Sequence, residues 1–154
     1  MEMKYTKIRT CISVGILLAA SFAFNASAAE NDMSPVDVVG MGTQVLQQMD
    51  GGQTGVIWDN ASAVLKAQVS KEQFTEQSNA RKRGFTANGD RAWVTVSRNR
   101  FPEAAPPAPP AGLYANVVFV TPGAAGEAMS ELVSFRLEKD NRWRVVGYVP
   151  EIRK

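Results

Sequence analysis

The residue types that could carry chemistry in this chain are few. Its 154 residues include no histidine, and the one cysteine, Cys11, lies close to the N-terminus. Common zinc sites, cysteine nucleophiles and histidine-based triads are therefore excluded from the rest of the chain. The acidic residues lack calcium-loop spacing, and no glycine-rich phosphate loop is present. The sequence thus predicts no catalytic residue, no cofactor-binding residue and no metal ligand.

Tyrosine and carboxylate side chains are the groups that remain for acid–base chemistry. In cone-shaped folds that resemble ketosteroid isomerase, an Asp base and a Tyr donor share an apolar pocket. Tyr114 and Tyr148, with Asp37 and Asp59, are the residues that such a pocket would use here. The alternative is a tyrosine that packs its ring and exposes its hydroxyl, which is the more common arrangement. We therefore do not expect an enzyme.

Charged residues are separated along the chain. Residues 30–76 contain seven acidic and two basic residues, whereas residues 81–100 contain six basic residues and one acidic residue. A basic patch that includes Arg81, Arg83 and Arg91 could meet an anionic partner, such as a lipid headgroup or an acidic protein surface. The alternative, which we favour, is that these charges are solvated or pair with the acidic half of the same domain.

Three tryptophans could either fill the core or contact a ligand. Trp58 and Trp143 are expected in the core, where loss of a buried tryptophan costs about 3–5 kcal/mol. Trp93 alternates with apolar neighbours on a predicted strand and is expected to face solvent, a ligand or a second subunit. The candidate binding surface predicted from the sequence consists of Trp93, Tyr114, Tyr148, Arg81, Arg83 and Arg91.

Helices must position these residues in the first half of the chain. Ser34 followed by Pro35 is a favourable helix start, and Ser70 followed by Gln73 has the spacing of a capping box. Apolar residues recur at helical spacing after both caps. We expect a helix over residues 35–50, one or two short helices over 54–68, and a helix over about 71–83.

Alternating patterns predict strands in the second half, over residues 91–100, 113–121, 132–138 and 143–149. The polar turn at 139–142 makes the last two strands antiparallel. On the last strand, simple alternation places Tyr148 on the opposite face from Trp143 and Val145. The fold class is therefore α+β, with N-terminal helices packed against a four-stranded antiparallel sheet, as in cystatin-like or cone-shaped domains.

A proline-rich segment, residues 102–112, joins the first two predicted strands. Proline lacks a backbone donor, so this segment cannot be a central strand and is expected to project from the sheet edge as a stiff spacer. The PxxP spacing of Pro106 and Pro109 is the alternative, because such motifs bind aromatic-lined grooves.

The N-terminal residues predict export. A positive segment, an apolar stretch over about 12–24 and the small residues around Ala28 and Ala29 are typical of a cleaved signal peptide over residues 1–29. Cleavage leaves a single α+β domain, residues 30–154, with 14 basic and 14 acidic residues. A neutral domain does not favour nucleic acid as a partner, and the apolar stretch is too short for a stable membrane span. We expect a periplasmic or secreted bacterial protein.

Several motifs follow one another over about residues 38–149: Asp50-Gly51, Trp58-Asp59, Ser70 with Phe74, Arg81 with Gly84, Pro110 to Tyr114, Glu131 and Asn141 to Tyr148. Their order and spacing resemble domain-of-unknown-function family 4019. The most specific part is the polar turn followed by a Trp-Arg-Val-x-Gly-Tyr ending. The resemblance implies a small exported bacterial protein with no established activity, and it transfers no catalytic residue.

Two hypotheses of function follow. The first is a non-enzymatic binding or interaction module of the cell envelope, whose partner is an envelope protein, a small anionic or apolar ligand, or a second copy of the chain. The alternative is a small-molecule-binding or isomerase-like cone with a Tyr/Asp pocket. A pocket of several hundred cubic ångströms with a buried carboxylate near a tyrosine hydroxyl would favour the alternative. An exposed apolar sheet face would favour interaction.

Overall fold

Four helices precede the sheet in the computed structural model, which describes residues 33–103, 105 and 107–154. The proposed signal peptide lies outside the described residues. Ser34 caps the first helix, because its side chain accepts a hydrogen bond from the backbone N–H of Asp37 and the Asp37 carboxylate binds back. Ser70 and Gln73 form the predicted capping box. The helices are α1 (Pro35–Asp50), α2 (Thr54–Asp59), α3 (Ala63–Gln68) and α4 (Lys71–Ala80).

All four predicted strands are present and pair in chain order as an antiparallel sheet, β1-β2-β3-β4. This confirms the α+β class; the narrower cystatin-like or cone-shaped description stays a prediction. Within the described residues, no helix is long and apolar enough to cross a membrane. The strands are β1 (Ala92–Phe101), β2 (Gly112–Pro122), β3 (Ala128–Leu137) and β4 (Trp143–Arg153), with a short 3-10 turn at Ala124–Gly126 between β2 and β3.

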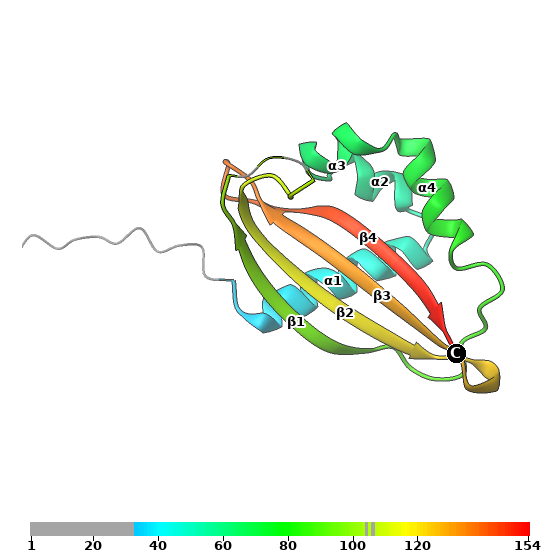
Figure 1. The fold of residues 1–154 in the computed structure, drawn as a ribbon. Coiled ribbons are helices and arrows are strands. Elements are labelled where there is room, and N and C mark those ends of the chain that lie inside the picture. Colours follow the sequence, from blue (N-terminus) through cyan, green and yellow to red (C-terminus); the bar gives the residue numbers. More distant parts are fainter. Residues whose placement is uncertain (1–32, 104, 106) are drawn as a thin grey trace, which may run out of the picture. The chain divides into compact units, whose positions relative to one another are not determined.

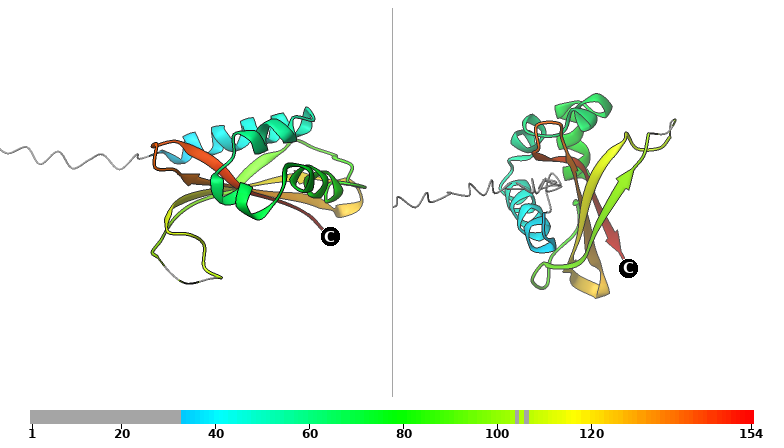
Figure 2. Two further views of the ribbon diagram at one scale, coloured as in Figure 1. Left: turned by 90° about the horizontal axis from the view of Figure 1, so that it is seen from above. Right: turned by 90° about the vertical axis from the view of Figure 1, so that its left-hand side faces the viewer.

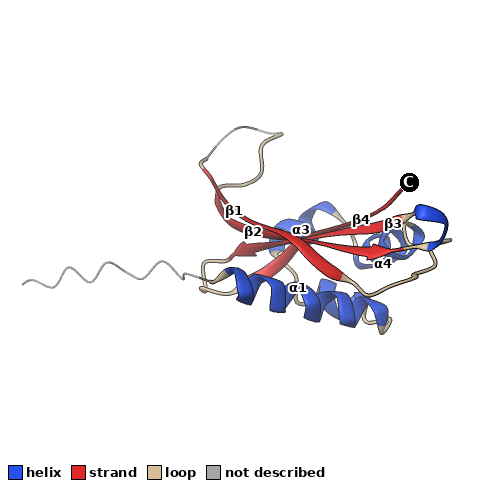
Figure 3. Ribbon diagram, turned by 90° about the horizontal axis from the view of Figure 1, so that it is seen from below, coloured by secondary structure: helices blue, strands red, loops and turns tan. Residues whose placement is uncertain are grey.

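The helices are placed on the sheet in two groups. Helix α1 runs across one face and contacts β1 and β2, whereas α3 and α4 contact β4 (Figure 1). Helix α2 contacts both α1 and α4, and so joins the two groups. The proline-rich loop extends from the end of β1 and β2 on the side of the sheet opposite α1 (Figures 2 and 3).

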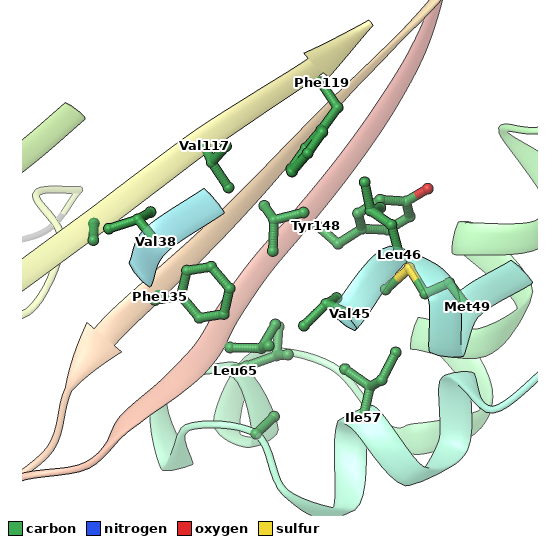
Figure 4. Packing of buried hydrophobic residues seen from close by; sticks show 14 of the residues in the cluster. Val38, Val45, Leu46, Met49, Ile57, Leu65, Val117, Phe119, Phe135 and Tyr148 are labelled. Carbon is green, nitrogen blue, oxygen red and sulfur yellow. The ribbon is translucent and has the colours of Figure 1, made fainter. Parts of the chain in front are cut away.

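The hydrophobic core lies between α1 and the sheet. Val38 and Leu46 of α1 are fully buried, as are Val117 and Val133 on the facing strands. Figure 4 shows side chains of α1 meeting Phe119, Phe135 and Tyr148 from three different strands. The prediction that Trp58 and Trp143 belong to the core needs a correction. Both are only partly buried and pack against the edge of the buried cluster, because aliphatic side chains fill its centre.

A β-bulge in β4 changes which face Tyr148 occupies. Ser134 pairs with Gly147 but Phe135 pairs with Val145, so Val146 is an extra residue in β4. The extra residue shifts the alternation by one position. Val145 and Tyr148 therefore both point into the core, and the prediction of opposite faces was wrong. A second irregularity, between Trp93 and Thr95 in β1, likewise interrupts simple alternation.

The proline-rich loop is anchored on its C-terminal side. The Tyr114 hydroxyl donates a hydrogen bond to the Pro110 carbonyl at 2.7 Å, and the Arg136 guanidinium donates to the Ala111 carbonyl at 2.9 Å. Pro106 lies outside the described residues, so its PxxP role stays a prediction. The described part projects beyond the strands, as expected, and is also fastened to the sheet.

Candidate functional site

Glu131 is a carboxylate on the apolar face of β3. It lies between Met129 and Val133 on that face, and its side chain is fully buried. Its partner in β2 is Phe119, which is itself buried in the core. A buried carboxylate in such surroundings carries a large desolvation cost unless charges and hydrogen bonds compensate it. The residues around Glu131 supply that compensation.

Four charged residues, of which Glu131 is one, form a closed ring of alternating sign. The Lys82 ammonium lies 3.3 Å from Oε1 of Glu131 and 3.0 Å from Oδ1 of Asp50. The Arg91 guanidinium lies 2.8 Å from Oε2 of Glu131, through Nε, and 2.8 Å from Oδ2 of Asp50, through Nη1. Each cation thus bridges both carboxylates. We call Asp50, Lys82, Arg91 and Glu131 the charge ring.

The contact between Arg91 and Glu131 is an ion pair without a well-directed hydrogen bond. The two atoms are 2.8 Å apart, yet neither Nε of Arg91 nor Oε2 of Glu131 makes a hydrogen bond among the described residues. Burial alone would lower the pKa of the guanidinium, but the hydrogen bond to Asp50 and the charge of Glu131 outweigh it and raise the pKa. Arg91 is therefore cationic at any physiological pH.

Tyr148 completes the surroundings of Glu131. Its hydroxyl donates a hydrogen bond of 2.7 Å to Oε1 of Glu131, and its ring lies 5.7 Å from the Lys82 ammonium, within cation–π range. Burial, then the hydrogen bond to Glu131 and its negative charge, raise the pKa of Tyr148 above the ordinary value of 10.0. The hydroxyl is consequently a permanent donor at neutral pH.

Asp50 is the exposed member of the charge ring. It is the last residue of α1, and its side chain is 46% exposed, against 25% for Lys82 and 27% for Arg91. Burial would raise the pKa of Asp50, but hydrogen bonds from Arg91 and Lys82 hold the pKa below the ordinary value of 3.8. A carboxylate at a helix C-terminus is disfavoured by the helix dipole, so the two cations explain its position.

A cavity of about 320 Å³ opens beside the charge ring. Thr121, which pairs with Met129 in the sheet register, is one of its lining residues. This residue is only 7% exposed, and its Oγ1 has no hydrogen-bond partner among the described residues. A buried hydroxyl without a partner is unfavourable, so it marks a place where a ligand could bind. The remaining lining residues are Asp50, Lys82, Phe85, Ala87, Arg91 and Glu131.

A larger cavity, of about 430 Å³, lies under the proline-rich loop. It is lined by Phe101, by prolines 107, 109 and 110 of the loop, and by Tyr114. The Tyr114 hydroxyl already binds the Pro110 carbonyl, and no charged residue lines this cavity. The smaller cavity therefore has the stronger chemical signal.

The structure brings together two of the six residues predicted for the binding surface. Arg91 and Tyr148 both contact Glu131. Arg81 lines a very small separate cavity that Tyr148 also borders, and Arg83 is exposed. Tyr114 lies under the proline-rich loop, and Trp93 is 55% exposed on β1, facing outward as expected.

The carboxylate beside the tyrosine is a glutamate, which corrects the predicted Tyr/Asp pairing. The Asp37 carboxylate accepts a hydrogen bond from the hydroxyl of Ser34, the N-cap of α1. Asp59 forms an ion pair of 2.6 Å with Lys71. Both aspartates thus have local structural partners and neither approaches Tyr148 through any hydrogen bond of the described residues.

The sequence contained a signal for Glu131 that the predicted strand boundary concealed. Because the third strand was expected to begin at residue 132, Glu131 was left outside it. The strand begins at Ala128, and Met129, Glu131, Val133 and Phe135 then alternate on one buried face. A charged residue in such an alternation indicates a compensated buried charge. No comparable local signal marks Thr121.

The charge ring is not arranged as a metal site. Its two carboxylates are each bridged by two cations. In the part of the chain that the structure describes, no group of three or more His, Cys, Asp or Glu residues could hold a metal ion.

The fold and the site together define a small α+β domain with a buried charged cluster beside a polar cavity. Residues 41–148 match the model of a family described as a protein of unknown function, DUF4019, and the chain belongs to that family. Asp50, Glu131 and Tyr148, which carry part of the resemblance, are far apart in the sequence and meet at this site. Comparison with curated proteins and with solved structures finds no match in either set.

Proposed function

We propose that the mature protein is an exported, non-enzymatic domain that binds a small polar molecule in the cavity beside Glu131. One observation carries this proposal: a preformed cluster of charges lines a cavity together with Thr121, whose buried hydroxyl has no hydrogen-bond partner among the described residues. A cavity of about 320 Å³ lies at the lower end of the range of small-molecule sites. Its convergent polar groups are the feature that such sites use for orientation.

Binding fits the site better than catalysis. The raised pKa of Tyr148 keeps its proton in place, so the hydroxyl is a poor general acid near neutral pH. Both oxygens of Glu131 lie within ion-pair distance of a cation, and one of them also accepts from Tyr148. A general base needs a lone pair that can reach the substrate. The isomerase-like alternative therefore lacks a free general base at this site. The other part of that alternative, binding of a small molecule, is the part that we propose.

A threonine substitution tests the proposed cavity. Thr121→Val removes the hydroxyl and preserves the shape of the side chain, and Thr95→Val on the exposed part of β1 is the matched control. Thermal shift and calorimetry would be run with a panel of small carboxylates, phosphate esters, amines and sugars. We expect saturable binding of at least one class, weakened about 2- to 10-fold by Thr121→Val, as for loss of one hydrogen bond. Absence of binding across the panel, or equal binding to both variants, would contradict the proposal.

Export is supported by the composition of residues 1–29 alone. Mass spectrometry of the protein recovered from the cell envelope should find an N-terminus at Ala29 or Glu30. Residues before Ala26 still attached to the recovered protein would show that the signal is not processed as proposed.

A second candidate function, self-association, is favoured by a row of apolar side chains across the other sheet face. In the register, Val149 pairs with Leu132, Leu132 pairs with Val118, and Val94 lies beside the end of this row on β1. Val149 is 45% exposed and Val94 is 54% exposed. Sedimentation should then show a dimer that Val149→Asp dissociates. A wild-type protein that stays monomeric at high concentration would eliminate this candidate.

A further inference from the structure

We infer that the cavity beside Glu131 binds the anionic group of a small organic carboxylate or phosphate ester, and that this group replaces Asp50 between Lys82 and Arg91. This inference rests on the proposed function and adds the class of ligand. The two possible anionic groups share one chemistry, because each offers oxygen acceptors to an ammonium and a guanidinium.

Lys82 and Arg91 cannot leave the ring. Each lies within 3.3 Å of the fully buried carboxylate of Glu131. Removing either cation would leave a buried charge without sufficient compensation, which is strongly destabilising. Lys82 and Arg91 are therefore the fixed cations of the charge ring, held by the buried carboxylate of Glu131. A cationic ligand would have to compete with both of them for the same carboxylates.

Asp50 is the member that can be exchanged. Its side chain is 46% exposed, so its carboxylate can turn fully into water, where it is solvated. It also stands at the C-terminal end of α1, where the dipole repels a carboxylate. An incoming anion that takes its place restores the charge balance of the ring. Displacing Asp50 therefore costs much less than displacing any buried member.

The rest of the cavity fits the remainder of such a ligand. Thr121 also lines the cavity, and its hydroxyl, which has no hydrogen-bond partner among the described residues, becomes a donor to an anionic oxygen when the side chain turns toward the ligand. Phe85, Ala87 and Met129 supply apolar lining next to the charged groups. A ligand with a small apolar body and a single anionic group satisfies both kinds of lining.

The decisive experiment removes the internal competitor. Asp50→Asn keeps the shape of the side chain and removes its charge, and Asp59→Asn is a matched control because Asp59 pairs with Lys71 elsewhere on the surface. Calorimetry with benzoate and with phenyl phosphate would measure affinity, with benzylamine and benzyl alcohol as cationic and neutral probes of similar size. We expect Asp50→Asn to bind one or both anions roughly tenfold more tightly than the wild type, and Asp59→Asn to leave affinity unchanged.

The probes also distinguish the two anionic groups, and they separate a failure of the anion inference from a failure of the proposed function. Preference for benzoate or for phenyl phosphate identifies the anionic group. Tighter binding of benzylamine or benzyl alcohol than of both anions, or anion affinity that Asp50→Asn leaves unchanged or weakens, overturns the anion inference and leaves the cavity as a binding site. Failure of every class of small molecule to bind overturns the proposed function itself.

A measurement on the unmodified chain guards against a variant that does not fold. The carboxyl carbon resonance of Asp50 should move when the preferred anion saturates wild-type protein, because the carboxylate leaves its two cations. The Asp59 resonance serves as the internal reference and should stay in place. Saturation with no movement of the Asp50 signal would overturn the exchange.

Discussion

Tyr148→Phe removes one hydroxyl from the interior of the domain and leaves the aromatic ring of this residue in the core. The lost interaction is the 2.7 Å hydrogen bond to the Glu131 carboxylate. Hydrogen bonds to charged groups contribute about 1.5–3 kcal/mol to the free energy of unfolding. We expect the variant to lose stability in this range, because Glu131 keeps its two cations but loses its hydrogen-bond donor.

Tyr114→Phe is a closely matched control for this change. Tyr114 and Tyr148 are 6% and 7% exposed, and the Tyr114 hydroxyl also donates a hydrogen bond of 2.7 Å. Its acceptor is the neutral carbonyl of Pro110, for which the expected loss is about 0.5–1.5 kcal/mol. The two variants therefore differ mainly in the charge of the acceptor, and Tyr148→Phe should cost about 1 kcal/mol more.

Urea unfolding followed by tryptophan fluorescence measures both costs, and an unchanged m-value would show that the denatured states are comparable. A Tyr148→Phe variant that is no less stable than Tyr114→Phe would refute the claim that a buried charged hydrogen bond holds Glu131.

The same hydroxyl makes a prediction for alkaline pH. Because the pKa of Tyr148 is raised in the folded state, the folded protein keeps this proton at a pH where the unfolded chain has lost it. Its contribution is complete below pH 10 and is lost as the pH rises above that value, with a slope of about 1.4 kcal/mol per pH unit. The stability difference between the wild type and Tyr148→Phe should therefore shrink above pH 10. A constant difference up to pH 11 would contradict the raised pKa.

Two further pairs of variants test the packing, again by urea unfolding. Gly42→Ala should cost about 1–3 kcal/mol, because the new Cβ would lie 2.5 Å from a side-chain carbon of Val117, whereas Gly40→Ala in the same helix meets nothing within 4 Å and should stabilise by about 0.5–1 kcal/mol. Effects of the opposite signs, or of equal size, would show that Gly42 of α1 does not pack against Val117 as described. Trp143→Ala should cost about 3 kcal/mol as a partly buried side chain at the core edge, and Trp93→Ala less than about 0.5 kcal/mol. If the Trp143 variant is as stable as the Trp93 variant, the Trp143 side chain does not pack against the edge of the core.

Local features of the chain were predictable where neighbouring residues decide them. The predicted cap at Ser34 and the predicted capping box at Ser70 are both present, because the partners of each cap lie within three residues. The four strands follow from the alternation of apolar residues, and the short polar turn at 139–142 forces the antiparallel pairing of the last two. The α4 helix ends at Ala80, about one turn before the expected position, as helix ends are weakly determined by local signals.

The candidate site was predictable only in part. Arg91 and Tyr148 were selected as residues of the binding surface, but the carboxylate that joins them was not. The predicted third strand begins four residues after the observed one, so the alternation that includes Glu131 is not visible in it. The face occupied by Tyr148 depended on the bulge at Val146, and nothing in the alternation of β4 indicated an extra residue.

The sequence by itself therefore determined the fold class, the helix starts and the strand order, along with the shortage of catalytic residue types. These properties depend on contacts within a few residues and on composition. Only the tertiary structure decided that Asp50, Lys82, Arg91 and Glu131 close a ring of charges beside the Thr121 hydroxyl. Such a cluster joins the end of α1, the segment between α4 and β1, and β3. Its stability comes from burial and mutual charge compensation, which exist only once the sheet and helices have packed together.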